Sequence, residues 1–152
     1  PESQLDRFLM RLKIGYPAEA AEKALLAGED RREMLARMAP ALGKAEIRAL
    51  QRAVSQIHAS PPIIDYCYDI IAFTRGSPYF VQGLSPRAGL ALLRAARAWS
   101  LLMGRDAVYP EDVQAVLGPC IRHRLENSGA METEDLAPRE AVSLILDQVP
   151  VR

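Results

Sequence analysis

Residues 10–16 restrict the fold of this chain more than any other segment, because apolar and polar side chains alternate there from Met10 to Ile14. Such alternation is typical of a half-buried β-strand. A strand cannot satisfy its backbone N–H and C=O groups alone, so it requires a neighbouring strand. The sequence offers no second convincing strand. We therefore expect a sheet-containing part of the protein upstream of residue 1.

The rest of the sequence predicts helices separated by proline, glycine and serine. Ala, Leu and Arg favour helices and are abundant, whereas aromatic residues make up only 6% of the chain. We expect an all-α helical bundle with a short N-terminal helix and one orphan strand. The expected helices are 2–10, 17–28, 30–39, 44–58, 61–76, 85–104 and 138–149, with another from Pro110 that Pro119 kinks or divides.

The longest expected helix, 85–104, carries an apolar face at helical spacing. A loop is expected just before it, over residues 79–84. The residues predicted to be buried on this face are Ala88, Leu92, Ala95, Ala96, Trp99 and Leu102.

Charge and cysteine content exclude several classes of protein. The 152 residues include 19 basic and 19 acidic side chains, so no overall field attracts DNA or an anionic membrane. No apolar run approaches the roughly 18 residues of a membrane span. Cys67 and Cys120 are too few for a disulfide framework, and we expect two buried thiols in a reducing cytoplasm. The segment from Glu126 onward is acidic, which leaves the preceding part mildly basic and suited to a phosphate-bearing ligand.

The triplet Ser85-Pro86-Arg87 is the most informative candidate site. Ser85 suits a helix N-cap and Pro86 the first helical position. Arg87 then lies in the first turn, where a cation opposes the helix dipole by roughly 0.3–1 kcal/mol. A guanidinium beside free N–H groups makes a phosphate site. The alternative is an arginine that faces solvent or pairs with a nearby carboxylate.

Other candidate residues are weaker on spacing alone. Arg7 follows Asp6 in a short helix and could reach a neighbouring subunit's phosphate or pair locally. His58 and His123 lack metal-ligand spacing, so no metal site is expected. Asp65 and Asp69 share a helix face, where a solvated acidic stripe is the simpler interpretation. No Walker lysine motif, glycine-rich phosphate loop or nucleophile elbow occurs.

Six short motifs, in this order and spacing, resemble the C-terminal portion of MoxR-family AAA+ ATPases. The resemblance covers the chain to about residue 125. The motifs are Pro1–Phe8 (P-E-x-Q-L-D-R-F), Ile14–Pro17, Val54–His58, Ser85–Ala88, Gly104–Val113 (G-R-D-x-V-x-P-x-D-V) and His123–Leu125.

The resemblance implies an AAA+ lid-type bundle and a role for several residues. Residues 1–16 would end the ATPase core, 17–125 would form the lid, and 126–152 an acidic helical tail. Arg87 would be the sensor-2 arginine on the γ-phosphate. Arg7 would be the arginine finger on the adjacent subunit's ATP. Tyr16 and Pro17 would lie near the base of the nucleotide, and the Walker A, Walker B and sensor-1 segments would lie upstream.

The same resemblance implies Mg-ATP as the ligand of the intact protein and a ring, expected to be a hexamer. It also implies a cytoplasmic location and a client protein, with von Willebrand factor A-domain proteins as candidates. This chain alone lacks both Walker segments, so it should neither bind ATP tightly nor hydrolyse it. We expect no nucleic-acid partner and no membrane insertion. The alternative is a free-standing helical module that binds a protein partner.

Overall fold

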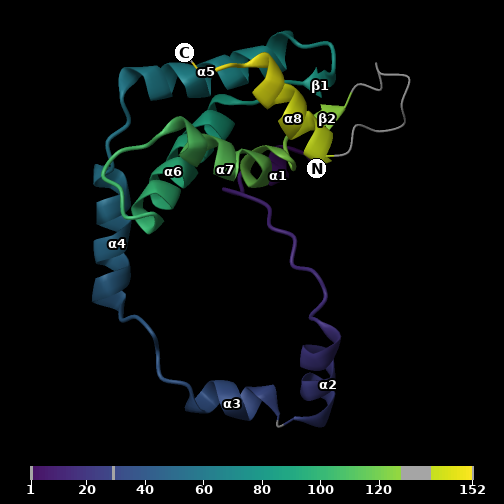
Figure 1. The fold of residues 1–152 in the computed structure, drawn as a ribbon, viewed down its shortest axis with the longest axis vertical. Helices are drawn as coiled ribbons and strands as arrows, with labels where there is room; N and C mark the ends of the chain where they lie inside the picture. The colour runs from purple at the N-terminus through teal and green to yellow at the C-terminus, as the bar shows by residue number, and fades with distance from the viewer. Residues whose placement is uncertain (1, 29, 128–137, 152) are drawn as a thin grey trace. The chain divides into compact units, whose positions relative to one another are not determined.

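The computed structural model describes residues 2–28, 30–127 and 138–151 (Figure 1). They form two compact units. The first comprises Pro1–Arg11 and Gln51–Arg152, and the second comprises Leu12–Leu50. Each unit is described by itself, and the boundaries expected at residues 16/17 and 125/126 stay predictions.

The first unit is a helical bundle with one small antiparallel ladder, so the all-α prediction is confirmed. The ladder joins β1 to β2 and pairs Phe80 with Asn127 and Gln82 with Glu126. Because β1 falls within residues 79–84, the expectation of a plain loop there was wrong. The elements of this unit are α1 (Glu2–Leu5), α5 (Pro61–Gly76), β1 (Phe80–Gln82), α6 (Pro86–Leu102), α7 (Pro110–Ile121), β2 (Glu126–Asn127) and α8 (Pro138–Gln148).

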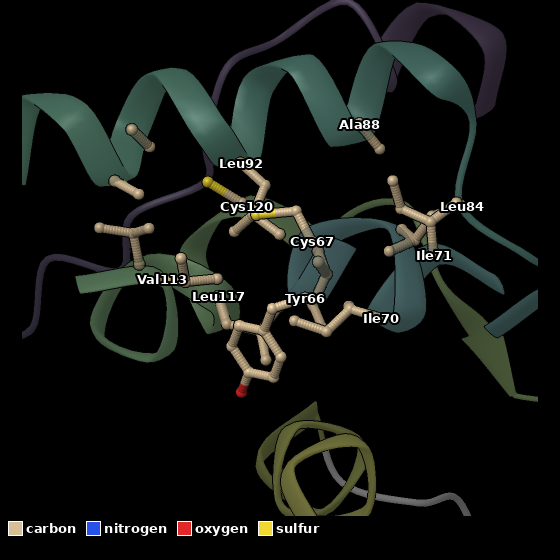
Figure 2. Packing of buried hydrophobic residues seen from close by; sticks show 14 of the residues in the cluster. Tyr66, Cys67, Ile70, Ile71, Leu84, Ala88, Leu92, Val113, Leu117 and Cys120 are labelled. Atoms are coloured by element: carbon tan, nitrogen blue, oxygen red, sulfur yellow. The ribbon is translucent and has the colours of Figure 1, made fainter. Parts of the chain in front are cut away.

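Helices α5, α6, α7 and α8 enclose the core of the first unit. Helix α6 packs chiefly against α7, and α5 contacts α6, α7 and α8. Ile70, Leu92, Val113 and Leu117 are at most 1% exposed, and Figure 2 shows them in one cluster. Burying each such side chain contributes roughly 1.5–3 kcal/mol. Ile145 of α8 is also fully buried, so the C-terminal helix belongs to this bundle.

Both cysteines lie within this cluster as free thiols, which confirms that they are buried (Figure 2). Burial raises the pKa of Cys67 and of Cys120 to about 11, although the positive charge of Arg124 lowers that of Cys120 in part. A thiol with such a pKa is protonated near neutral pH. Neither cysteine is therefore a nucleophile in the folded chain.

Proline defines several helix starts as the sequence predicts. Pro61, Pro86 and Pro110 each stand at the beginning of a helix. Pro119 does not divide α7, which continues to Ile121. The proline lies in the last turn, so its missing N–H removes only one bond near the helix end. Its own carbonyl accepts a hydrogen bond from the Arg11 N–H at 2.8 Å.

The predicted strand at residues 10–16 is not formed. Residues 10–18 belong to no helix or strand, although Arg11 makes the backbone bond to Pro119. A strand needs a neighbouring strand to satisfy its backbone N–H and C=O groups. None of the described residues forms a ladder with this segment. Alternation alone does not supply the hydrogen-bond partners.

The buried face of α6 differs from the prediction near its C-terminal end. Ala88, Leu92, Ala95 and Ala96 are buried as expected, but Trp99 is 39% and Leu102 75% exposed. Ser100 is buried instead, and its hydroxyl donates to the Ala107 carbonyl at 2.6 Å. The connector after α6 thus packs on the Ser100 side, which turns Trp99 and Leu102 outward.

The second unit contains helices without a core of their own. Helix α2 (Glu19–Ala27) and α3 (Arg31–Arg37) have no buried residue, and neither has α4 (Lys44–Gln56), which continues into the first unit. Asp30 caps α3 by accepting the Arg32 N–H at 2.9 Å. These helices expose apolar side chains such as Leu26 and Leu35.

Candidate functional site

A basic pocket of about 640 Å³ lies in the first unit. It is formed where the N-terminal segment, the turn after β1, the start of α6 and the end of α7 meet. Five arginines line it against two carboxylates, so the pocket favours an anion. The lining residues are Leu5, Asp6, Arg7, Arg11, Gln82, Gly83, Ser85, Arg87, Arg122, His123, Arg124, Leu125 and Glu126.

Arg7 and Arg87, the two arginines singled out from the sequence, both line this pocket. Within the described part of the chain, their side chains form no hydrogen bond or ion pair, and the same holds for Arg11 and Arg122. As far as the described residues go, four guanidinium groups at this pocket are therefore without a protein partner. This excludes the alternative that Arg87 pairs with a nearby carboxylate among the described residues.

The N-terminus of α6 is built as the sequence predicts. Ser85 is the N-cap in an extended backbone conformation, and its Oγ accepts the Ala88 N–H at 3.1 Å. Arg87 follows in the first turn and is exposed. The positive end of the helix dipole and the Arg87 charge therefore occupy the same edge of the pocket.

Arg124 holds the N-terminal segment against the end of α7. Its Nε donates to Asp6 Oδ1 at 2.9 Å, and one terminal nitrogen donates to the Asp6 carbonyl at 3.1 Å. The guanidinium also donates to the carbonyls of Phe8, Leu9 and Cys120. Sequence reasoning missed this role, although the His123–Leu125 motif marked the place.

His123 completes the contact with the same segment. Its Nε2 lies 3.2 Å from the Phe8 carbonyl, which can only accept, so Nε2 carries the proton and Nδ1 is an acceptor. Nδ1 is buried without a partner among the described residues. Burial lowers the pKa of His123, and the positive charges of Arg124 and Arg11 lower it further. The hydrogen bond to the Phe8 carbonyl and the negative charge of Asp6 raise this pKa in part. His123 is therefore neutral near pH 7.

The remaining candidates do not contribute to this pocket. Tyr16 is 98% exposed and belongs, with Pro17, to the second unit. Arg94 and Arg97 of α6 are absent from the residues that line the pocket. Asp65 and Asp69 line a separate hollow of about 420 Å³ with Tyr66 and Tyr68. No group of three His, Cys, Asp or Glu in the described ranges could hold a metal ion.

Comparison with known proteins shows what this chain is similar to. The model of the AAA lid domain matches residues 72–143. The chain is 34% identical over 151 residues to the uncharacterized protein YeaC of Bacillus subtilis. The aligned region covers 99% of this chain and 47% of YeaC. Chaperone MoxR1 of Mycobacterium tuberculosis is 28% identical, over 98% of this chain and 41% of the relative. Residues 72–143 thus match an AAA lid domain, and nearly the whole chain is similar to proteins that carry the MoxR name.

One further relative carries the MoxR name, and one solved structure shares the fold. Protein MoxR of Paracoccus denitrificans is 32% identical over 87% of this chain and 44% of the relative. A crystal structure from Cytophaga hutchinsonii superposes with a TM-score of 0.83 at 24% identity, over 100% of this chain and 49% of that chain, which shows the shared fold. The chain thus spans about half the length of the relatives that it matches.

None of the helices in the described ranges is long and apolar enough to cross a membrane.

Proposed function

We propose that the basic pocket of this lid receives the γ-phosphate of ATP, with Arg87 acting as the sensor-2 arginine and Arg7 as the arginine finger. The observation that carries this proposal is that both arginines line one pocket without a partner among the described residues. The MoxR-like assignment and the cap geometry of Ser85 support it.

The chemistry of the pocket suits a transferred phosphoryl group. Guanidinium groups bind phosphate oxygens through paired, charge-assisted hydrogen bonds. Charge develops on those oxygens as the bond to the leaving group breaks, so fixed positive charges lower the barrier. A finger arginine contributes about 10³–10⁵ in rate in other phosphoryl-transfer systems.

Arg7 and Arg87 would serve the same nucleotide. They belong to one compact unit and line one pocket of about 640 Å³, which supports placing both beside one phosphate. The resemblance assigns Arg7 to the ATP of an adjacent subunit. We infer that Arg87 would reach that ATP as well, so that the lid would close on its neighbour's nucleotide within a ring, which we expect to be a hexamer.

Hydrolysis would change the affinity of this pocket for the neighbouring nucleotide. A bound γ-phosphate favours the closed arrangement of lid and nucleotide, and its departure removes that bias. Tyr16 and Pro17 would form the junction at which the lid moves. One relative is named a chaperone, which supports coupling of this motion to remodelling or activation of a client protein, with von Willebrand factor A-domain proteins as candidates.

ATP turnover by the full-length protein that carries this chain tests the proposal. Arg87→Ala and Arg7→Ala should each lower turnover at least about tenfold, because each removes a charge from the phosphate site. Arg94→Ala is the matched control, since Arg94 is an exposed arginine of the same helix that does not line the pocket. Unchanged turnover in Arg87→Ala would remove Arg87 from the mechanism.

The second candidate is a helical protein-interaction module. The apolar side chains that α2, α3 and α4 expose favour it, because such surfaces are often covered by a partner. Robust ATP turnover by the full-length protein, lost in Arg87→Ala, favours the lid. A full-length protein without ATP turnover would favour the interaction module.

A further inference from the structure

We infer that Asp6 is a positioning residue that ties the Arg7 segment to the helix N-terminus that carries Arg87. The inference rests on the proposed function, since it concerns how two arginines are held around one phosphate. Asp6 precedes Arg7 directly, and its contacts reach the cap of α6 and the end of α7.

The first contact joins Asp6 to the cap of α6. The Ser85 hydroxyl donates to the Asp6 carboxylate, with Oγ 3.1 Å from Oδ1 and 3.0 Å from Oδ2. The same Oγ accepts the Ala88 N–H at 3.1 Å. Ser85 therefore caps the start of α6 and also holds Asp6, which lies 79 positions away in the sequence. Arg87 stands two residues beyond this hydroxyl.

The second contact fixes the carboxylate from the other side. Arg124 donates from Nε to Asp6 Oδ1 at 2.9 Å, and its side chain is 3% exposed against 27% for Asp6. Arg124 also donates to the Asp6 main-chain carbonyl at 3.1 Å. Both the side chain and the backbone of Asp6 are thus held, which restricts the backbone of Arg7 next to it.

Asp6 would act through the arginines and not on the phosphate, because a carboxylate repels an anion. Loss of the Asp6 carboxylate keeps both Arg7 and Arg87 in the protein. It removes the contact that holds the Arg7 segment against the start of α6. A displacement of about 1 Å at a catalytic group can cost roughly 10²-fold in rate. The effect should fall on kcat more than on KM, because a finger arginine acts mainly in the transition state.

The test is ATP turnover by the full-length protein with Asp6→Asn, alone and combined with Arg7→Ala or Arg87→Ala. Asparagine keeps the shape of the aspartate side chain but removes its negative charge. Its NH₂ group is a donor, so it cannot accept the hydrogen bonds of the Arg124 guanidinium as a carboxylate oxygen does. We expect Asp6→Asn to lower kcat about 10–100-fold with less than about threefold change in KM. Adding Arg7→Ala to it should then cost less than about threefold, because a displaced finger contributes little. Asp147→Asn, an exposed aspartate of α8, is the matched control.

The outcomes separate this inference from the proposed function. If Asp6→Asn keeps full kcat while Arg7→Ala and Arg87→Ala each lose at least about tenfold, the role of Asp6 is refuted and the phosphate pocket stands. Full additivity of Asp6→Asn with Arg7→Ala would also refute it. If neither arginine variant changes turnover, the proposed function itself fails.

Thermal unfolding would reveal whether Asp6→Asn still folds. If it does not fold, a second pair of variants at Ser85 tests the same contact. Ser85→Ala removes the hydroxyl that holds Asp6, and Ser85→Thr keeps one. We expect Ser85→Ala to lower kcat and Ser85→Thr to recover most of that loss. Ser60→Ala is the matched control, because Ser60 caps α5 without a side-chain hydrogen bond. Equal kcat in Ser85→Ala and in Ser60→Ala would overturn the inference.

Discussion

The guanidinium of Arg124 holds the carboxylate of Asp6, with Nε 2.9 Å from Oδ1, across 118 positions of sequence. Only 3% of the Arg124 side chain is exposed. The same group donates to the main-chain carbonyls of Asp6 at 3.1 Å and Leu9 at 3.3 Å. One side chain thus anchors the N-terminal segment to the end of α7, and the basic pocket depends on this attachment.

Arg124→Ala should lower the free energy of unfolding of this chain by about 3 kcal/mol, because it removes the charged donor of the Asp6 carboxylate and of several main-chain carbonyls. Urea denaturation measures the change. Arg94→Ala, which removes an exposed arginine, should stay within about 0.5 kcal/mol of wild type. A loss below about 1 kcal/mol in Arg124→Ala would contradict the anchoring role.

Asp112 and Glu111 provide a matched pair at the start of α7. Asp112 is fully buried, accepts the Tyr109 N–H at 2.9 Å and binds Arg105 at 3.0 Å, whereas exposed Glu111 meets the same arginine at 3.3 Å. We expect Asp112→Ala to cost about 2–4 kcal/mol and Glu111→Ala less than about 0.5 kcal/mol, measured by urea denaturation. Similar losses of unfolding free energy in the two variants would contradict this account, because they would show that burial of Asp112 does not set its contribution to stability.

Gly83 lies where the chain after β1 passes close to α5. A Cβ added there would come within 2.5 Å of the Arg75 Cα, a backbone atom that cannot move aside cheaply. Gly83→Ala should therefore destabilise the chain by about 1–3 kcal/mol in thermal or urea unfolding. Gly76→Ala is the control, since a Cβ at Gly76 meets nothing within 4 Å and should be near neutral. Wild-type stability in Gly83→Ala would show that the close approach is absent in solution.

His123 should make the stability of the chain depend on pH. Burial lowers the pKa of His123 below its ordinary value of about 6.5, so the unfolded chain binds this proton more readily than the folded one. The contribution of neutral His123 is complete above about pH 6.5 and is lost as pH falls from there through the folded pKa. The free energy of unfolding should therefore fall as the pH is lowered below about 6.5.

His123→Gln keeps a donor for the Phe8 carbonyl but cannot titrate, so its free energy of unfolding should vary less with pH over this range. The control is His58→Gln, which replaces an exposed histidine. An equal pH dependence in His123→Gln and in the wild type would contradict the assignment.

Local signals in the sequence predicted much of the fold. Pro61, Pro86 and Pro110 mark helix starts because proline fits the first turn and disrupts later ones. The strand at residues 10–16 failed because a ladder needs a partner that the described residues do not supply. Trp99 was placed inside because periodicity does not reveal that the next residue, Ser100, finds an acceptor in the connector.

The candidate site was predictable only in part. Arg7 and Arg87 were singled out by the resemblance of their motifs, and spacing alone left both open. The contact of Asp6 with Arg124 joins segments far apart in the sequence, so no local pattern reports it. The gathering of Arg11 and Arg122 into the same pocket is likewise a property of the packed chain.

Mixing of variant subunits tests the central claim most directly. Full-length Arg7→Ala and Arg87→Ala proteins are combined in equal amounts under conditions of assembly, and ATP turnover is compared with each variant alone. If both arginines of one lid serve the same nucleotide, every site in the mixture lacks one arginine, and turnover should stay at the level of the single variants. Recovery to about a quarter of wild-type turnover would mean that the two arginines reach each nucleotide from different subunits, which would contradict the shared pocket.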